Sequence, residues 1–511
     1  SNCTFTKISG RGREGYVFTS NGACHTHVIM DRCNFVDCGK VGSYQLISLL
    51  SQQSSIKLYG CKFTFSTSRV CGVLELRTND CLFDHCQFTG CAADTILLSN
   101  RAGSNEQPVG TFEFTNNQVT NNKGKFINAV RLLNKPIIDN NIFESTTLSG
   151  GYFIQLPNNQ EVIELNNNTF SQISSSGTQD KSCGGVGIFI ESTNSEFTIK
   201  YNKCKFYDIT NDQSAYPNCQ GGAIQYGFSD SSNLNCHLEI TNCEFKGNKV
   251  KRHGGAIAIR TAKSVLIQNC KFESNLANND NSNNNGELLF TNHYEDKTKG
   301  VGGSIYLNPT FNLNGNDHEM TSISISGCTF KNNAAYQGYA IYLGGEESST
   351  IISISSNTFD GNKGAEDSPN NGGIICSELA TVDNEVVISS NRFYSIGTSE
   401  RFSYVDYAGN MIPKPIPKPT RFPGTVDTFI NKVFTGSVGS SQVQIGTGNI
   451  NQISGCRFTN IAVTDKNYYL KINSETIIFD NIFENTEFID QPERAGIFWN
   501  DHSGKITLSN C

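Results

Sequence analysis

The chain of 511 residues contains 19 cysteines, the side chains with the most distinctive chemistry in the sequence. Thiols form disulfides, bind soft metal ions and act as nucleophiles. No Cys-x-x-Cys pair occurs, which argues against a structural zinc site and a thioredoxin-like redox site. Nine cysteines instead lie two residues before a recurring aromatic residue, namely Cys3, Cys33, Cys61, Cys86, Cys204, Cys243, Cys270, Cys328 and Cys456. This regular placement indicates a role in a repeated structure.

The sequence leaves two roles open for these thiols. They can pack as small buried apolar groups, or they can form disulfides between successive repeats, which would suit an oxidising extracellular compartment. Four further cysteines are disulfide candidates. Cys38 and Cys91 stand where the repeat otherwise has asparagine, and Cys183 and Cys219 precede glycine pairs. The spacing assigns no pairing among them.

One histidine pair has a spacing that could bind a metal ion. His25 and His27 would face the same side of a strand. A complete site needs three or four ligands, and the sequence suggests no third one nearby. We therefore predict neither a metal site nor a cofactor.

Two tripeptides match the acceptor pattern for N-linked glycosylation, Asn2-Cys3-Thr4 and Asn167-Asn168-Thr169. Both overlap a corner of the repeat at which side chains are expected to lean inward. Asn167 is the better acceptor if its side chain points outward.

The elements that carry these residues follow one repeated pattern, apolar-x-apolar-x-(Asn/Ser/Gly)-(Cys/Asn)-x-Phe, and residues 238–245 and 265–272 are clear copies. The closing aromatic residue, once a valine, anchors each copy: Phe5, Phe35, Phe63, Phe88, Val119, Phe143, Phe170, Phe206, Phe245, Phe272, Phe330, Phe359, Phe393, Phe434, Phe458 and Phe483. Most anchors are separated by roughly 24 to 36 residues, which matches one coil of a solenoid.

The alternation within each copy predicts a strand with one buried face. The parity changes within the copy, because Ile240 and Asn242 share one face whereas Cys243 and Phe245 share the other. Both pairs can point inward only if the chain bends between Asn242 and Cys243. Because every copy runs in the same direction, we predict an all-β, right-handed parallel β-helix of about 16 coils.

Two shorter motifs complete the predicted coil. An asparagine follows the anchor by three residues, as Asn248 follows Phe245, and its amide can bond turn backbone and equivalent amides of adjacent coils. A glycine pair then opens the next strand, as at Gly254 and Gly255. Glycine at such a corner permits a positive φ or a close backbone approach.

We expect a single solenoid over residues 1–511, cut from a longer chain because both ends resemble interrupted copies of the repeat. Two longer spacings predict loop insertions at about 276–300 and 400–425. The first is rich in asparagine, and the second contains a proline-rich segment, residues 412–423, which favours polyproline II structure. Each insertion is either a plain loop or a place of partner contact.

The Gly-Gly-Ala-Ile motifs at residues 221–224 and 254–257, together with the Phe-x-x-Asn motifs, resemble the paired repeats of chlamydial polymorphic outer-membrane proteins. Similar repeats occur in surface proteins of some parasitic protists. Elsewhere in this chain the glycine motif is degraded, for example at residues 338–341. The resemblance implies a surface-displayed β-helical passenger linked to adhesion and immune exposure.

Charge and composition exclude some functions. The formal net charge is -7, and no group of Lys or Arg forms a stripe that would neutralise phosphates, so we expect no nucleic-acid partner. The sequence contains no run of 18 apolar residues, so it predicts no membrane-spanning helix.

Three functions remain. We expect a non-enzymatic extracellular or cell-surface β-helix that acts in adhesion or as a surface coat and contacts proteins or glycans. The first alternative is a structural subunit of an extracellular filament or appendage, which contacts copies of itself. The second is a carbohydrate-active β-helix, a lyase or hydrolase. None of the polygalacturonase motifs Asn-Thr-Asp, Asp-Asp, Gly-His-Gly and Arg-Ile-Lys is present, and we name no catalytic residue.

Overall fold

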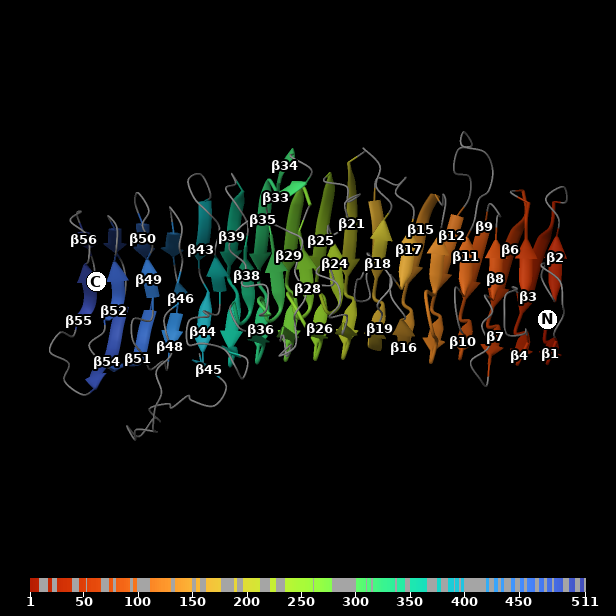
Figure 1. Ribbon diagram of the computed structural model, residues 1–511, viewed down its shortest axis with the longest axis horizontal. Helices are drawn as coiled ribbons and strands as arrows, with labels where there is room; N and C mark the ends of the chain where they lie inside the picture. The colour runs from red at the N-terminus through yellow and green to blue at the C-terminus, as the bar shows by residue number, and fades with distance from the viewer. Residues whose placement is uncertain are drawn as a thin grey trace, which may run out of the picture. The chain divides into compact units, whose positions relative to one another are not determined.

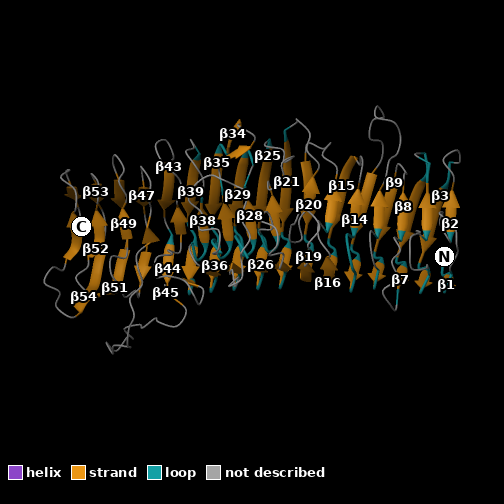
Figure 2. Cartoon of the chain, viewed as in Figure 1, coloured by secondary structure: helices purple, strands orange, loops and turns teal. Residues whose placement is uncertain are grey.

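The computed structural model describes residues 1–8, 17–20, 25–38, 46–51, 53–65, 73–76, 80–91, 95–98, 111–129, 134–148, 153–156, 162–175, 188–190, 196–211, 221–226, 235–260, 262–277, 300–308, 310–313, 316–335, 338–344, 350–364, 375–377, 385–389, 391–394, 397–398, 420–421, 427–430, 433–435, 443–445, 451–454, 457–464, 468–472, 476–479, 482–489, 496–500 and 506–509. All regular structure within these residues is β-strand (Figure 2). The chain forms two compact units, residues Ser1–Cys219 with Ala223–Glu239 and residues Gln220–Gly222 with Ile240–Cys511.

Each coil of the first unit contributes short strands to three parallel stacks, in which equivalent strands of successive coils lie side by side (Figure 1). Stack 1 precedes the first corner of the coil and comprises β3(His27–Asp31), β6(Ser55–Tyr59), β9(Asp80–Asp84), β12(Thr111–Thr115), β15(Asn134–Asp139), β18(Val162–Asn166), β21(Phe197–Asn202) and most of β25(Cys236–Thr241). Stack 2 carries the anchors and comprises β1(Thr4–Thr6), β4(Asn34–Val36), β7(Lys62–Thr64), β10(Gln87–Thr89), β13(Gln118–Thr120), β16(Ile142–Leu148), β19(Thr169–Ser175), β22(Lys205–Tyr207) and β23(Thr210–Asn211). Stack 3 comprises β2(Phe18–Ser20), β5(Ile47–Leu49), β8(Leu74–Leu76), β11(Ile96–Leu98), β14(Ile127–Ala129), β17(Ile154–Leu156) and β20(Ile188–Ile190), and β24(Ile224–Tyr226) also belongs to this unit.

The second unit repeats the arrangement. Stack 1 comprises β29(Ser264–Gln268), β35(Ser322–Ser326), β39(Ile351–Ser355), β43(Glu385–Ser389), β47(Asp427–Ile430), β50(Asn451–Ser454), β53(Thr476–Phe479) and β56(Ile506–Ser509). Stack 2 comprises β26(Glu244–Lys246), β27(Lys249–Val250), β30(Lys271–Glu273), β31(Leu276–Ala277), β36(Thr329–Lys331), β37(Ala334–Ala335), β40(Thr358–Asp360), β41(Lys363–Gly364), β44(Arg392–Tyr394), β45(Gly397–Thr398), β48(Val433–Thr435), β51(Arg457–Thr464) and β54(Ile482–Ile489). Stack 3 comprises β28(Ile257–Ile259), β32(Ile305–Leu307), β38(Ile341–Leu343) and β42(Ile375–Ser377), with a further sheet of β46(Thr420–Arg421), β49(Val443–Ile445), β52(Tyr468–Ile472) and β55(Gly496–Asn500). An antiparallel hairpin pairs β33(Thr310–Leu313) with β34(Asn316–Glu319).

The stacks confirm the predicted parallel β-helix. Anchors of successive coils are direct partners in the strand register, as Phe35 is with Phe63 and Phe245 is with Phe272. The right-handed winding remains an expectation that rests on the strong preference of parallel crossovers. Of the two predicted insertions, residues 278–299, 400–419 and 422–425 lie outside the described residues.

The anchors form the core as columns of stacked rings. In the second unit Phe272 lies between Phe245 and Phe330, with ring centroids 4.9 and 4.8 Å away, and the column continues to Phe359 at 4.8 Å from Phe330. All four side chains are fully buried. The centroid spacing equals the distance between hydrogen-bonded strands, so each added coil extends the column by one ring.

One anchor of the first unit is a valine, and other phenylalanines fill the space that its missing ring leaves. Val119 is buried between Phe88 and Phe143 in the register. Phe126 packs edge-on against both of these rings, with centroids 5.4 and 5.9 Å away, and Phe114 lies 6.0 Å from Phe88. The neighbouring rings therefore fill the space beside Val119, and the core remains densely packed.

The bend between stacks 1 and 2, which we call corner 1, is made by a residue with a left-handed backbone. Asn242 has φ of 55° and its side chain is exposed, whereas Ile240 and Cys243 on either side are buried. The prediction that Asn242 points inward with Ile240 is therefore wrong, because the bend lies at Asn242 itself. The equivalent residue of most other described coils also has positive φ: Asn2, Arg32, Gly60, His85, Asn116, Asn140, Asn167, Lys203, Asn269, Gly327 and Ser356. Asparagine and glycine predominate because they tolerate this conformation best.

The two glycines of the glycine corner have different tasks. Gly254 has φ of +70°, which favours a residue without Cβ. Gly255 faces the next coil so closely that a Cβ would lie 2.0 Å from the carbonyl oxygen of Gly303. Both predicted reasons for glycine therefore apply, one to each position of the pair.

Candidate functional site

A ladder of buried side chains runs inside corner 1 and joins each coil to its neighbours. Asn141 donates from Nδ2 to the carbonyl oxygen of Phe114 at 2.7 Å and to Oδ1 of Asn168 at 3.0 Å. Its Oδ1 accepts the backbone N–H of Asn117 at 2.9 Å. All these bonds cross between coils, so the amide holds its coil to the coil before and the coil after. Asn357 and Asn391 make the same bonds in the second unit.

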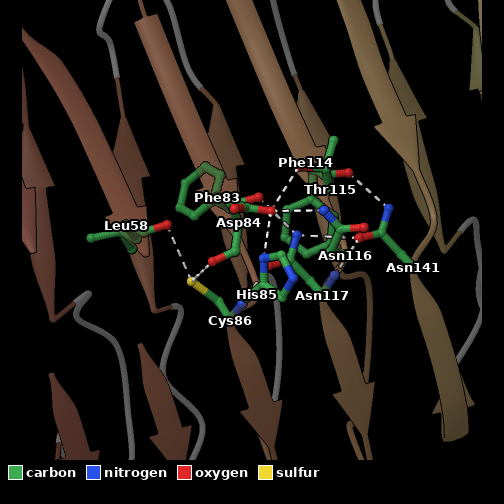
Figure 3. Close-up of polar contacts among 10 residues, drawn as sticks. All are labelled: Leu58, Phe83, Asp84, His85, Cys86, Phe114, Thr115, Asn116, Asn117 and Asn141. Carbon is green, nitrogen blue, oxygen red and sulfur yellow. Dashed lines mark hydrogen bonds and ion pairs between the residues drawn. The ribbon is translucent and has the colours of Figure 1, made fainter. Parts of the chain in front are cut away.

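Cysteine takes the place of asparagine in the same ladder. The thiol of Cys86 donates to the carbonyl oxygen of Leu58 at 3.4 Å, and its backbone N–H donates to Oδ1 of Asn117 at 2.8 Å (Figure 3). In the second unit the Sγ atom of Cys270 accepts the backbone N–H of Cys243 at 3.4 Å. The thiol therefore supplies one donor and one acceptor, whereas the amide of Asn141 donates two hydrogen bonds. The cysteines of this ladder are buried polar links between coils.

A second ladder follows the anchors, at the asparagine predicted from the Phe-x-x-Asn motif. Asn275 donates to the carbonyl oxygen of Phe245 and to Oδ1 of Asn333, both at 3.0 Å. Its Oδ1 accepts the backbone N–H of Asn248 at 3.1 Å. The predicted amide ladder is present here, and Asn362 extends it by another coil.

The disulfide candidates Cys38 and Cys91 belong to this second ladder. The thiol of Cys38 donates to the carbonyl oxygen of Phe5 at 3.3 Å, and the backbone N–H of Cys91 donates to Oδ1 of Asn122 at 2.7 Å. Both side chains are buried. Their coils are separated by one further coil, as the register of β4, β7 and β10 shows. Their Cα atoms are therefore about 9.6 Å apart, too far for a disulfide between them. Cys183 and Cys219 lie outside the described residues.

Neighbouring thiols in the corner 1 ladder change each other's pKa. A hydrogen bond from Cys86 lowers the pKa of the Cys61 thiol, and the same contact, together with burial, raises the pKa of Cys86. Burial alone would raise the pKa of Cys270, but hydrogen bonds from the thiols of Cys243 and Cys328 lower it. The cysteines of adjacent coils are neighbours in the strand register, as Cys61 and Cys86 are.

The outward side of corner 1 carries a polar cluster around Asp84, which lies at the end of β9. Its carboxylate accepts hydrogen bonds from Nδ2 of Asn116 at 2.8 Å, from Nδ1 of His85 at 2.9 Å and from Oγ1 of Thr115 at 3.2 Å (Figure 3). Burial alone would raise the pKa of Asp84, but these hydrogen bonds together lower it. The cluster contains an oriented carboxylate and an exposed imidazole, and the nearest thiol, Cys86, is buried on the other side of the backbone. Its contacts orient the corner and bring no nucleophile to the surface.

Charged side chains also gather on the outward face of stack 1 in the first unit. His237 Nε2 lies 2.7 Å from Glu196 Oε1, and Lys200 Nζ lies 3.4 Å from Glu239 Oε2. Glu164, in the preceding coil, is the register partner of Lys200. A glycosidase or lyase needs carboxylates that converge on one bond. Here the charged groups form ion pairs along a sheet face, and such pairs align neighbouring strands.

The structure describes both predicted histidines and both predicted glycosylation sites. His25 and His27 are exposed, and Nδ1 of His27 lies 2.9 Å from the hydroxyl of Ser55. Within the described residues no three His, Cys, Asp or Glu side chains are grouped to hold a metal ion. Asn2 and Asn167 are exposed left-handed corner residues, and Nδ2 of Asn167 donates to Oδ1 of Asn140 at 2.8 Å. Asn167 therefore points outward, whereas the ladder residue beside it, Asn168, is buried.

The sequence reasoning missed the Asp84 cluster and the ion pairs, because their partners are about one coil apart along the chain and depend on the register. The left-handed column at corner 1 could have been recognised from the frequency of Asn and Gly at this position. No protein-family model matches the chain, and no curated protein matches it. The described part of the chain contains no helix of a length and hydrophobicity that would cross a membrane.

Proposed function

We propose that the protein is a non-enzymatic β-helix displayed outside the cell, where it acts in adhesion or as a surface coat by contacting proteins or glycans. This proposal includes the kinship that the glycine and Phe-x-x-Asn motifs suggest with polymorphic outer-membrane proteins. The ladders support it, since they commit the buried polar groups to holding coils together. They leave the outward faces to carry function.

The observation that carries the proposal is the exposure of large apolar side chains on one face. On stack 1 of the first unit, Ile29 is 68% exposed, Ile137 is 41% exposed, and Val162 and Tyr59 are 39% and 36% exposed. These side chains lie on the outward face of β3, β6, β15 and β18, where a partner can contact them. Charged residues such as Glu164 stand between them on the same face, and an interface with such a mixture suits a polar partner.

Binding to cells and glycans tests the proposal. The full chain is labelled and applied to fixed epithelial cells and to an immobilised glycan array. We expect saturable binding that the triple variant Ile29→Ser, Ile137→Ser, Val162→Ser weakens at least tenfold. A matched control replaces the exposed apolar residues Ile8 and Ile142, which lie off this face, with serine and retains binding.

Two results would overturn the proposal in favour of its alternatives. Concentration-dependent growth of the chain into fibres, measured by light scattering and electron microscopy without binding to either surface, would indicate a filament subunit. Release of sugars from a polysaccharide panel, abolished by Glu239→Gln or Glu164→Gln, would indicate a carbohydrate-active enzyme.

A further inference from the structure

Cys61 and Cys86 occupy equivalent positions in adjacent coils of the first unit. Cys61 connects β6 to β7, and Cys86 connects β9 to β10, and these strand pairs are in register on both sides of the cysteines. Adjacent parallel strands are about 4.8 Å apart. Disulfides form between residues whose Cα atoms are roughly 4.4 to 6.8 Å apart. The register therefore places the two cysteines within disulfide range without a shift of the backbone.

Cys61 has a neighbouring cysteine on each side in the column, and the two neighbours affect it differently. The thiols of Cys61 and Cys86 shift each other's pKa, whereas Cys33, on the other side, acts on the pKa of Cys61 through its backbone. In the second unit the Cys270 thiol touches both Cys243 and Cys328, so geometry selects no single partner there. Cys61 and Cys86 are therefore the pair that the register makes adjacent and whose thiols act on each other's pKa.

We propose that Cys61 and Cys86 are a modification site at which a small-molecule disulfide, such as oxidised glutathione, cross-links two adjacent coils. The inference does not depend on the proposed surface role. It names a pair that the spacing alone does not single out. It also differs from the candidates Cys38 and Cys91, whose separation forbids a bond between them.

The reaction is a two-step exchange. The Cys61 thiolate attacks one sulfur of oxidised glutathione, a mixed disulfide forms, and one glutathione thiolate leaves. Sγ of Cys86 then attacks Sγ of Cys61 and displaces the second glutathione thiolate. The protons of the two cysteines pass to the leaving thiolates. The protein pair loses two electrons, and one oxidised glutathione becomes two reduced glutathiones.

The attacking form of Cys61 in the first step is its thiolate. The side chains of Cys61 and Cys86 are both fully buried in the folded coil. The exchange therefore takes place while the coil is open, during folding in an oxidising compartment or during local opening of the folded chain.

Mass spectrometry of the full chain tests the proposal. The chain is secreted into the bacterial periplasm with oxidised glutathione in the medium and is then denatured in iodoacetamide. Digestion with trypsin and chymotrypsin separates Cys86 from Cys81 and Cys91, because Phe83 and Phe88 lie between them. We expect a peptide with Cys61 joined to a peptide with Cys86, which reduction separates. Reduction should also lower the thermal midpoint by a few degrees.

Two variants and an internal control define which results support the proposal and which contradict it. Cys86→Ser should abolish the linked peptide and leave Cys61 alkylated, while Cys38→Ser, which removes a buried thiol of the other ladder, should keep the link. The measurement on the unmodified chain decides the question even if Cys86→Ser fails to fold. The exposed Cys3 is the internal control, because its oxidation shows that the oxidant was active. If Cys3 is oxidised while Cys61 and Cys86 both carry the iodoacetamide label, the proposal is overturned. A disulfide between Cys61 and Cys33 would also overturn it.

Discussion

At the scale of single residues, one buried amide performs the work that holds two coils in register. Asn275 accepts from Asn248 and donates to Phe245 and Asn333. These bonds give the backbone N–H of Asn248 an acceptor and the carbonyl oxygen of Phe245 a side-chain donor. An asparagine at this position is therefore more than a turn former, because its amide also links the coils on both sides.

We predict that Asn275→Ala lowers the free energy of unfolding of the second unit by about 3 kcal/mol, because buried donors and acceptors lose their partners. Asn275→Cys should cost about half as much, since Cys38 supplies the equivalent donor to Phe5. Urea unfolding followed by circular dichroism measures both values. Equal losses for the two variants would show that the thiol does not substitute for the amide.

The outward cluster predicts a pH dependence. Hydrogen bonds lower the pKa of Asp84 in the folded chain against the opposing effect of burial. Stability that depends on its carboxylate is therefore fully present above the ordinary pKa near 3.9, and it is lost as the pH falls through the lower folded value. We expect Asp84→Asn to be less stable than the unmodified chain by about 0.5–1 kcal/mol at pH 7. The difference should disappear at acid pH, and a constant difference across the pH range would contradict this explanation.

At the scale of the element, the corners decide where glycine is required. Gly255 and Gly60 both lie at corners, yet only Gly255 faces a backbone oxygen at a distance that excludes a Cβ. A Cβ on Gly60 would meet the Cγ atom of Arg32 at 3.3 Å, and a flexible side chain can move. Gly60 has φ of +58°, the conformation that Asn116 and Asn140 adopt at the same corner in other coils.

We predict opposite outcomes for two substitutions at these corners. Gly255→Ala should lower the free energy of unfolding by about 4 kcal/mol or more, because the coils must separate to admit the methyl group. Gly60→Asn should change it by no more than about 0.5 kcal/mol, because asparagine tolerates the left-handed backbone. Thermal unfolding of the two variants under the same conditions compares them. A Gly60→Asn variant as unstable as Gly255→Ala would contradict the explanation that a close backbone contact makes glycine necessary at Gly255 and not at Gly60.

These elements also show how far the sequence predicts the structure. The anchors, the amide ladder and the glycine corner follow from periodicity and side-chain chemistry, because each is repeated within one copy. Asn242 was misplaced because alternation shows that a bend occurs and not which residue makes it. The contacts of Asp84 and the interchange of Cys86 with Asn117 depend on which residues of neighbouring coils become adjacent. The described register supplies that information, and the spacing within one copy does not.

At the scale of the whole molecule, the repeated coils imply that stability is a sum of local terms. A coil in a solenoid contacts the coils directly before and after it, so damage to one coil weakens its neighbours most. The ladders follow this rule, since the side-chain bonds of Asn275 reach Asn248, Phe245 and Asn333, which lie in adjacent coils. A lost rung therefore opens a limited part of the chain, and the consequence is measurable by amide exchange.

We predict that Asn275→Ala accelerates hydrogen exchange in β26, β30 and β36, where anchors Phe245, Phe272 and Phe330 pair, and leaves β6 and β9 of the first unit unchanged. The amides of these strands exchange through local opening, and the free energy of opening falls only where the lost amide made contacts. Hydrogen exchange followed by mass spectrometry resolves the strands as separate peptides. Faster exchange at β6 and β9 by the same factor would mean that the chain opens as one cooperative body, and the nearest-neighbour description of the coils would then fail.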